Sequence, residues 1–229
     1  MDAVDLGVNL FVALFALVDP IGNIPIFAAA TAGASARQRM HVTALLVLFI
    51  VGFLTVFFFT GLSLLQFFGI SLAAFRIGGG ILLFMLGLEM VRENFLQSFV
   101  DADAINDAKD VRGYARRRFQ RLVVPFAMPL IIGPGAISAV IIQASSAEEI
   151  GYTGWLAGVV AIVAAGLATF ACFALSGPIS RLIGEVGMAI VVRVLGLILV
   201  ALGIQFVLAG LGEALPGMFA SSVISPAGH

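Results

Sequence analysis

The sequence predicts an all-α membrane protein in which six transmembrane helices form two inverted three-helix repeats. Three observations support this fold class: the composition, six long apolar segments and an internal repeat. Hydrophobic residues make up 61% of the 229 residues and charged residues only 11%, and the mean hydropathy is +1.14. Because a soluble domain is about one quarter charged, this chain has too few charges to cover a surface that faces water.

Six apolar segments are long enough for a membrane-spanning helix, which needs about 20 apolar residues. They cover residues 5–32, 42–62, 71–91, 122–146, 153–176 and 187–211. The first is not expected to be a signal peptide, because its start contains Asp2 and Asp5 and no Lys or Arg. The first and fourth segments are interrupted by proline and glycine, so these two helices are expected to be broken in mid-membrane.

The basic residues predict how the chain is oriented. With six spans, the loops after the first, third and fifth lie on one side of the membrane. These loops contain Arg37, Arg39, Arg92, Lys109, Arg112, Arg116, Arg117, Arg118, Arg121 and Arg181. The other side has no Lys or Arg outside the helices. The positive-inside rule therefore places the three basic loops in the cytoplasm and both termini outside.

The spans define the domain organisation. Residues 1–91 are the first repeat, 92–121 a cytoplasmic loop, 122–211 the inverted second repeat, and 212–229 an external tail. The loop is the one segment with an aqueous composition, and its basic end is predicted to anchor the fourth span at the membrane surface. Recognition of anionic lipids by this basic cluster is the secondary interpretation.

An internal repeat relates the two halves. A shift of 114 residues places Pro20 on Pro134, and after a two-residue insertion Gly80 falls on Gly196. Small residues recur every seven positions in the third and sixth spans, at Ala73, Gly80 and Gly87 and at Ala189, Gly196, Gly203 and Gly210. Such seams let helix backbones approach closely. Because each half has three spans, the halves must enter the membrane from opposite sides, as in many secondary transporters.

The two broken helices are the predicted substrate site. The residues assigned to it are Asp19, Pro20, Gly22, Asn23, Pro25, Gly133, Pro134, Gly135 and Ser138. Unwound backbone at membrane depth is tolerated where it lines a wet cavity or is buried in protein, and paired breaks are typical of transporter sites. Amides freed at the breaks should favour an anionic group such as a carboxylate. The alternative interpretation is a pair of proline kinks that serve helix packing only.

Four isolated polar residues accompany the breaks. Asp19 is a costly charge in mid-membrane, and is interpreted as a functional residue rather than a purely structural cap. Arg76 and Arg193 lie a few residues inside the third and sixth spans. They either face the bundle and support the site or extend to the nearer interface. Gln205 is expected to form hydrogen bonds between helices.

Several chemistries are not expected. His41, His229 and Cys172 are isolated from one another, so the sequence predicts no metal site. It contains no phosphate-binding glycine loop and no nucleophile elbow, so neither an enzyme nor a cofactor is expected. A net charge of −1 gives no basic field for nucleic acid.

The segments Asp19–Phe27 and Pro129–Ser138 resemble the paired signatures of the MarC family, and the resemblance covers nearly the whole chain. It implies a protein of the bacterial or archaeal inner membrane, grouped with the LysE-type exporters of amino acids. Some members of the family are described as transporters of small neutral amino acids such as glycine and alanine.

The leading functional hypothesis is therefore secondary transport of a small neutral amino acid, coupled to H⁺ or Na⁺ and working by alternating access. Two alternatives remain at this point: a passive channel, and a structural or lipid-handling membrane protein that carries no solute. The sequence leaves the substrate, the direction of transport and the oligomeric state open.

Overall fold

The computed structural model describes residues 2–92, 95, 111–122 and 131–215. Eight helices occur in these ranges: α1 (Ala3–Val18), α2 (Ile24–Ala30), α3 (Ala36–Phe67), α4 (Leu72–Val91), α5 (Val111–Leu122), α6 (Pro134–Ile150), α7 (Tyr152–Ala174) and α8 (Ser176–Ala214). No strand occurs in the described ranges, so the all-α fold class is confirmed for them.

Four helices are long and apolar enough to cross a membrane. They are α3, α4, α7 and the Val186–Ala214 part of α8, and they match the second, third, fifth and sixth predicted spans. Gly184 has a positive φ of 72° and separates this long part of α8 from a short first part. The first predicted span is divided into α1 and α2. Most of the described part of the fourth lies in α6, and residues 123–130 are outside the described ranges.

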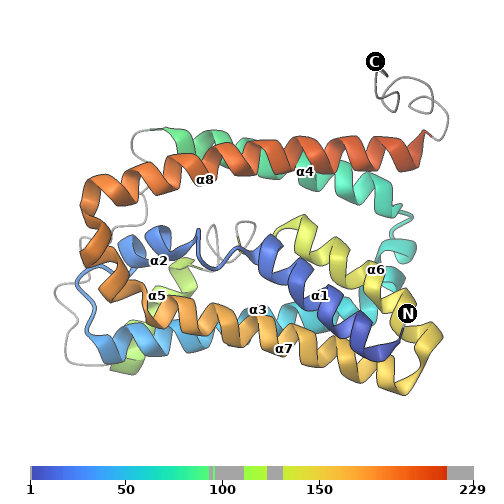
Figure 1. Ribbon diagram of the computed structural model, residues 1–229, viewed down its shortest axis with the longest axis horizontal. Coiled ribbons are helices and arrows are strands. Elements are labelled where there is room, and N and C mark those ends of the chain that lie inside the picture. The colour runs from blue at the N-terminus through green and yellow to red at the C-terminus, as the bar shows by residue number, and fades with distance from the viewer. Residues whose placement is uncertain (1, 93–94, 96–110, 123–130, 216–229) are drawn as a thin grey trace, which may run out of the picture.

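The helices form three layers (Figure 1). α4 and α8 lie side by side along one edge of the view, α3 and α7 lie along the other, and α1 and α2 lie end to end between them. The N-terminus, the α3–α4 and α6–α7 connections and the end of α8 share one end of the long axis. The α2–α3 and α7–α8 connections and α5 share the other.

Glycine allows α4 and α8 to pack with their backbones in contact. A Cβ atom on Gly80 would lie 2.5 Å from the carbonyl oxygen of Gly203, and one on Gly203 would lie 2.6 Å from that of Gly80. Gly87 and Gly196 are related in the same reciprocal way, at 2.6 and 2.8 Å. The contacts run in opposite directions along the two chains, so the helices are antiparallel. The close approach expected of the seven-residue seams is confirmed.

α1 is apolar on both of its faces. Its buried face, which packs against α6 and α7, carries Leu6, Leu10, Leu14 and Val18. Its outer face carries Val4, Val8 and Val12, which are 71%, 56% and 58% exposed. A helix that is hydrophobic all round is expected where lipid, and not water, covers the outer face.

The basic end of the central loop folds onto the bundle. It forms α5, which packs against α3 and buries Tyr114, Ala115 and Arg118. The Arg118 guanidinium donates a hydrogen bond from Nε to the carbonyl oxygen of Ala30, the last residue of α2. A cation is favoured at this negative end of a helix. The aqueous loop expected for residues 92–121 is thus in part a docked helix, and residues 93–94 and 96–110 lie outside the described ranges.

We predict that Gly80→Ala destabilises the protein and that Gly78→Ala does not. A Cβ on Gly80 meets the backbone of α8, whereas one on Gly78 meets nothing within 4 Å. Overpacking costs about 1–3 kcal/mol, whereas alanine in place of an unhindered helical glycine gains up to about 1 kcal/mol. Thermal unfolding in detergent should show a lower Tm for Gly80→Ala alone. Equal Tm values for the two variants would contradict the backbone contact.

Candidate functional site

The first break separates α1 from α2. α1 ends at Val18, and Asp19 follows in the left-handed conformation with φ 42° and ψ 63°. Among the described residues, Asp19 is the only one other than glycine with a positive φ, a conformation that Asp and Asn tolerate better than most residues. Pro20 has no amide hydrogen, so the carbonyl group of Ala16 loses its usual donor four residues later. The predicted unwinding of the first span is therefore present.

The side chains of Asp19 and Asn23 hold this turn together. The Asp19 carboxylate accepts a hydrogen bond from the Gly22 amide at 3.0 Å. The Asn23 side chain donates through Nδ2 to the carbonyl oxygens of Val18 and Asp19, each at 3.0 Å. The backbone amides of Asn23 and Ile24 also have acceptors, at Asp19 and Ile21. The amides of residues 22–24, expected to be free for a carboxylate, are therefore occupied within the turn.

The first break presents hydrogen-bond acceptors instead of donors. Asn23 is 2% exposed, and its Oδ1 atom has no hydrogen-bond partner among the described residues. Among the described residues, none forms an ion pair with Asp19. Buried polar atoms without partners are rare and call for an explanation. A carboxylate and an amide oxygen together attract a cation or an N–H donor.

A small cavity adjoins these oxygens. It measures about 20 Å³, enough for one water molecule. Residues at the first break and on one face of α8 line it, namely Ala16, Leu17, Asp19, Asn23, Leu195, Ile198, Leu199 and Leu202. The cavity places the first break directly against α8.

The second break leads into α6 and has the opposite character. Gly133 is the N-cap in an extended conformation, Pro134 occupies the first turn, and no side chain caps the helix. Amides in the first turn have no acceptor within a helix, and here Gly133–Ser138 are all buried. Ser138 is 1% exposed and its Oγ atom has no partner among the described residues. The second break therefore presents hydrogen-bond donors and the positive end of a helix dipole.

The two breaks approach each other through apolar side chains. A Cβ atom on Gly135 would lie 3.1 Å from Cδ2 of Leu17 and 2.6 Å from Cζ of Phe206. Leu17 also lines the cavity beside Asp19. The Leu17 side chain therefore lies next to both the start of α6 and the small cavity beside Asp19.

Each break also packs against a long helix. A Cβ on Gly22 would lie 2.8 Å from Cδ1 of Leu195 in α8. At the second break, the Pro134 ring occupies the space that a side chain on Gly79 of α4 would need. Pro25, the remaining predicted site residue, is buried in the first turn of α2.

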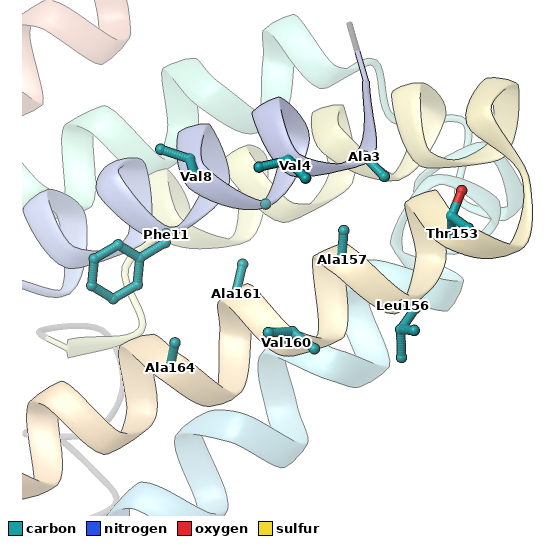
Figure 2. Close-up of a pocket in the computed structure, with 11 residues that line it drawn as sticks. Ala3, Val4, Val8, Phe11, Thr153, Leu156, Ala157, Val160, Ala161 and Ala164 are labelled. Carbon is teal, nitrogen blue, oxygen red and sulfur yellow. The ribbon is translucent and has the colours of Figure 1, made fainter.

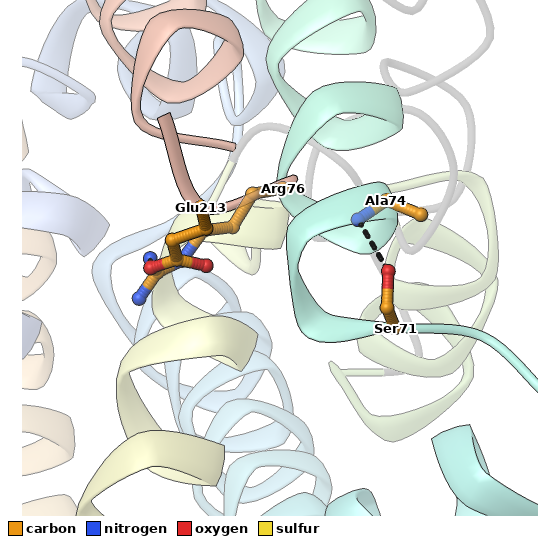
Figure 3. Close-up of polar contacts among 4 residues, drawn as sticks. All are labelled: Ser71, Ala74, Arg76 and Glu213. Carbon is orange, nitrogen blue, oxygen red and sulfur yellow. Dashed lines mark hydrogen bonds and ion pairs between the residues drawn. The ribbon is translucent and has the colours of Figure 1, made fainter. Parts of the chain in front are cut away.

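The three supporting residues predicted from the sequence lie elsewhere. Arg76, near the start of α4, forms an ion pair with Glu213 near the end of α8 (Figure 3). The sequence places Glu213 in a predicted external tail beginning at residue 212, but α8 continues to Ala214. Arg193 and Gln205 are exposed on α8. Leu17, Leu195 and Phe206 were missed, because single apolar residues carry no signal in a chain composed largely of them.

A larger cavity elsewhere is lined almost entirely by apolar residues. It measures about 440 Å³ and lies between α1 and α7, with Thr153 as its one lining residue with a polar side chain (Figure 2). Its remaining lining residues are Ala3, Val4, Gly7, Val8, Phe11, Leu156, Ala157, Val160, Ala161 and Ala164. Such a surface suits lipid chains and offers a polar solute only the Thr153 hydroxyl.

Comparison with known proteins places the chain in a family. The model of the MarC family integral membrane proteins matches residues 5–215. The chain is 35% identical over 213 residues to the UPF0056 membrane protein YhcE of Escherichia coli, covering 92% of this chain and 94% of that one. It is 30% identical over 214 residues to a UPF0056 membrane protein of the archaeon Pyrococcus horikoshii, covering 93% and 98%.

A third relative, a UPF0056 membrane protein of Buchnera aphidicola, is 32% identical over 216 residues. No solved structure matches the chain. The relatives come from bacteria and archaea and share nearly the full length of this sequence. Together with the apolar helices and the two proline-containing breaks, these matches identify the chain as a member of the MarC family of integral membrane proteins.

Proposed function

We propose that this protein is a secondary transporter of a small zwitterion, a neutral amino acid such as glycine or alanine. The observation that carries the proposal is the complementary chemistry of the two breaks. The first offers the Asp19 carboxylate and the Asn23 Oδ1 atom, whereas the second offers a buried helix N-terminus without a side-chain cap and the Ser138 hydroxyl. Neither Asn23 Oδ1 nor Ser138 Oγ has a hydrogen-bond partner among the described residues. A zwitterion carries one charged group for each break, an ammonium group for the first and a carboxylate for the second. The proposal assigns no enzymatic reaction and no cofactor to the chain.

The binding mode follows from these charges. The substrate carboxylate accepts hydrogen bonds from the first-turn amides of α6 and from Ser138. The substrate ammonium group lies toward Asp19 and Asn23. The cavity beside Asp19, at about 20 Å³, admits a water molecule or a small cation but no amino acid. Admission of substrate therefore requires Leu17 and Phe206 to move, and the closed cavity is the place for a coupling H⁺ or Na⁺.

Alternating access requires two similar halves, and the helix contacts support the inverted repeat. The repeat relates Gly80 to Gly196 and Gly87 to Gly203, so the Gly80–Gly203 contact should be matched by one between Gly196 and Gly87. This second contact is present. Two equivalent halves related by an axis in the membrane plane give two states open to opposite sides.

The contacts that the two breaks make with α8 and α4 follow the same repeat. The first break contacts Leu195 and the second contacts Gly79, and these two positions differ by the same 116 residues that separate Gly80 from Gly196. We accordingly assign six membrane crossings, of which the first is α1 with α2 and the fourth includes α6.

The orientation comes from the basic residues. The end of the molecule that holds α5 and the α2–α3 and α7–α8 connections also holds most of the Lys and Arg residues of the sequence. The positive-inside rule places that end in the cytoplasm of a bacterial or archaeal cell and both termini outside the inner membrane.

Counterflow in proteoliposomes tests the function itself. Radiolabelled glycine or alanine should accumulate inside vesicles preloaded with the unlabelled amino acid. Flux without counterflow would instead indicate a passive channel. If none of a panel of small amino acids moves, a structural or lipid-handling role without solute transport takes the place of this proposal.

We predict that Asp19→Asn abolishes proton- or sodium-driven accumulation and leaves the fold intact. Asparagine tolerates the left-handed conformation and can still accept the Gly22 amide, so only the charge is lost. Asp5→Asn is the matched control, since it makes the same change in the same helix, at its exposed N-terminal cap. Uptake should be lost in the first variant and retained in the second. Unchanged coupled uptake by Asp19→Asn would exclude the role given to this carboxylate.

We predict that Ser138→Ala raises the KM for uptake by at least about tenfold, because a hydrogen bond to a charged group contributes about 1.5–3 kcal/mol. Ser176→Ala is the control: its hydroxyl is equally buried and unpartnered among the described residues, but lies where α8 begins. Both variants should keep the wild-type Tm. A similar KM for the two variants would remove Ser138 from the substrate site.

A further inference from the structure

A second cavity with polar groups lies between α3 and α5, and none of its lining residues belongs to either break. It measures about 550 Å³, within the range of small-molecule sites. Ala44, Leu45, Ala115 and Phe119 give it an apolar floor, and His41, Arg116 and Gln120 give it polar groups. Unlike the α1–α7 cavity of Figure 2, it combines alkyl surface with a cation.

The surrounding helices place this groove at a membrane surface. His41 lies in the second turn of α3, a helix long enough to span the membrane. α5 is amphipathic: Tyr114, Ala115 and Arg118 are buried, whereas Arg116 and Arg117 are exposed. A basic amphipathic helix of this kind lies in the interface between headgroups and acyl chains.

The charge around the groove is uniformly positive on these two helices. α3 contains Arg37 and Arg39, α5 contains five arginines, and neither helix contains Asp or Glu. Arg118 is engaged with the Ala30 carbonyl group. Arg116 is exposed beside the groove, and the His41 ring places Nδ1 2.8 Å from the Arg37 carbonyl oxygen.

We propose that this groove binds an anionic phospholipid, with its phosphate at Arg116 and an acyl chain along Ala44, Leu45 and Phe119. The charge and the shape select this occupant. A free phosphate ion would leave the apolar floor in contact with water, and a lipid without net charge would leave the arginine without an anionic partner, since α3 and α5 supply none. Basic clusters on interfacial helices recognise anionic headgroups by the same electrostatics. This binding site is independent of the transport proposal.

The test compares lipids and variants in the purified full chain. Native mass spectrometry would measure retention of phosphatidylglycerol and of phosphatidylcholine added in detergent. Wild-type protein should retain the anionic lipid preferentially. Arg116→Gln should weaken that retention by about fivefold, the effect of one basic residue at an anionic surface. Arg193→Gln, which removes an exposed arginine from α8, should leave it unchanged.

A second variant separates a groove from a diffuse surface charge. Ala44→Phe fills the apolar floor at an exposed position of α3 without altering any charge. It should reduce phosphatidylglycerol retention while its Tm stays near the wild-type value. Equal retention of the two lipids, equal effects of Arg116→Gln and Arg193→Gln, or full retention by Ala44→Phe would each overturn the proposal. Displacement of the lipid by millimolar inorganic phosphate would overturn it as well.

Discussion

Pro20 and Pro134 have no amide hydrogen; Pro20 lies between α1 and α2, and Pro134 is the first residue of α6. In a bilayer every backbone polar group needs a partner within the protein. The backbone groups that lose their helical partners at each break therefore need other partners nearby. At the first break, Asp19 and Asn23 take over the hydrogen bonds, and three successive amides find acceptors inside the turn. At the second break, a glycine N-cap leaves the first turn without a side-chain partner. The same proline constraint thus yields an acceptor-rich site and a donor-rich one.

The glycine seam between α4 and α8 determines where these sites lie. Backbone-to-backbone contact at Gly80 and Gly203 holds the two long helices as one antiparallel pair. Leu195 and Gly79, on the two members of that pair, are the seats of the first and second breaks. A helix pair in direct backbone contact moves as a unit more readily than it separates, because close packing resists deformation. In the proposed transport cycle, movement around the breaks would therefore fall to α1, α2 and α6 and to the side chains of Leu17 and Phe206.

The sequence was sufficient for the all-helical class, the broken first helix, the glycine seam and the family, because proline, glycine and seven-residue spacing act locally and have few interpretations. It did not anticipate that Asp19 and Asn23 would occupy the amides of their own turn, since the outcome depends on a left-handed conformation at Asp19. Two further contacts join distant residues, Arg118 with Ala30 and Arg76 with Glu213. No local pattern encodes such pairs. Glu213 also lies beyond the end predicted for the sixth span, so it was not considered as a partner for Arg76.

The contrast between the breaks gives the proposed cycle a polarity that the repeat alone would lack. Two identical halves would bind a zwitterion equally well in either direction, because each break would offer the same groups. Here the carboxylate and the amide oxygen belong to the first break, and the helix N-terminus without a side-chain cap and the hydroxyl belong to the second. Under the transport proposal, a bound amino acid would be held in one orientation, with each charged end attached to a different break. In the proposed cycle, movement of α1 and α2 against α6 would change both attachments at once, so loss of either end group from the substrate would uncouple binding from movement.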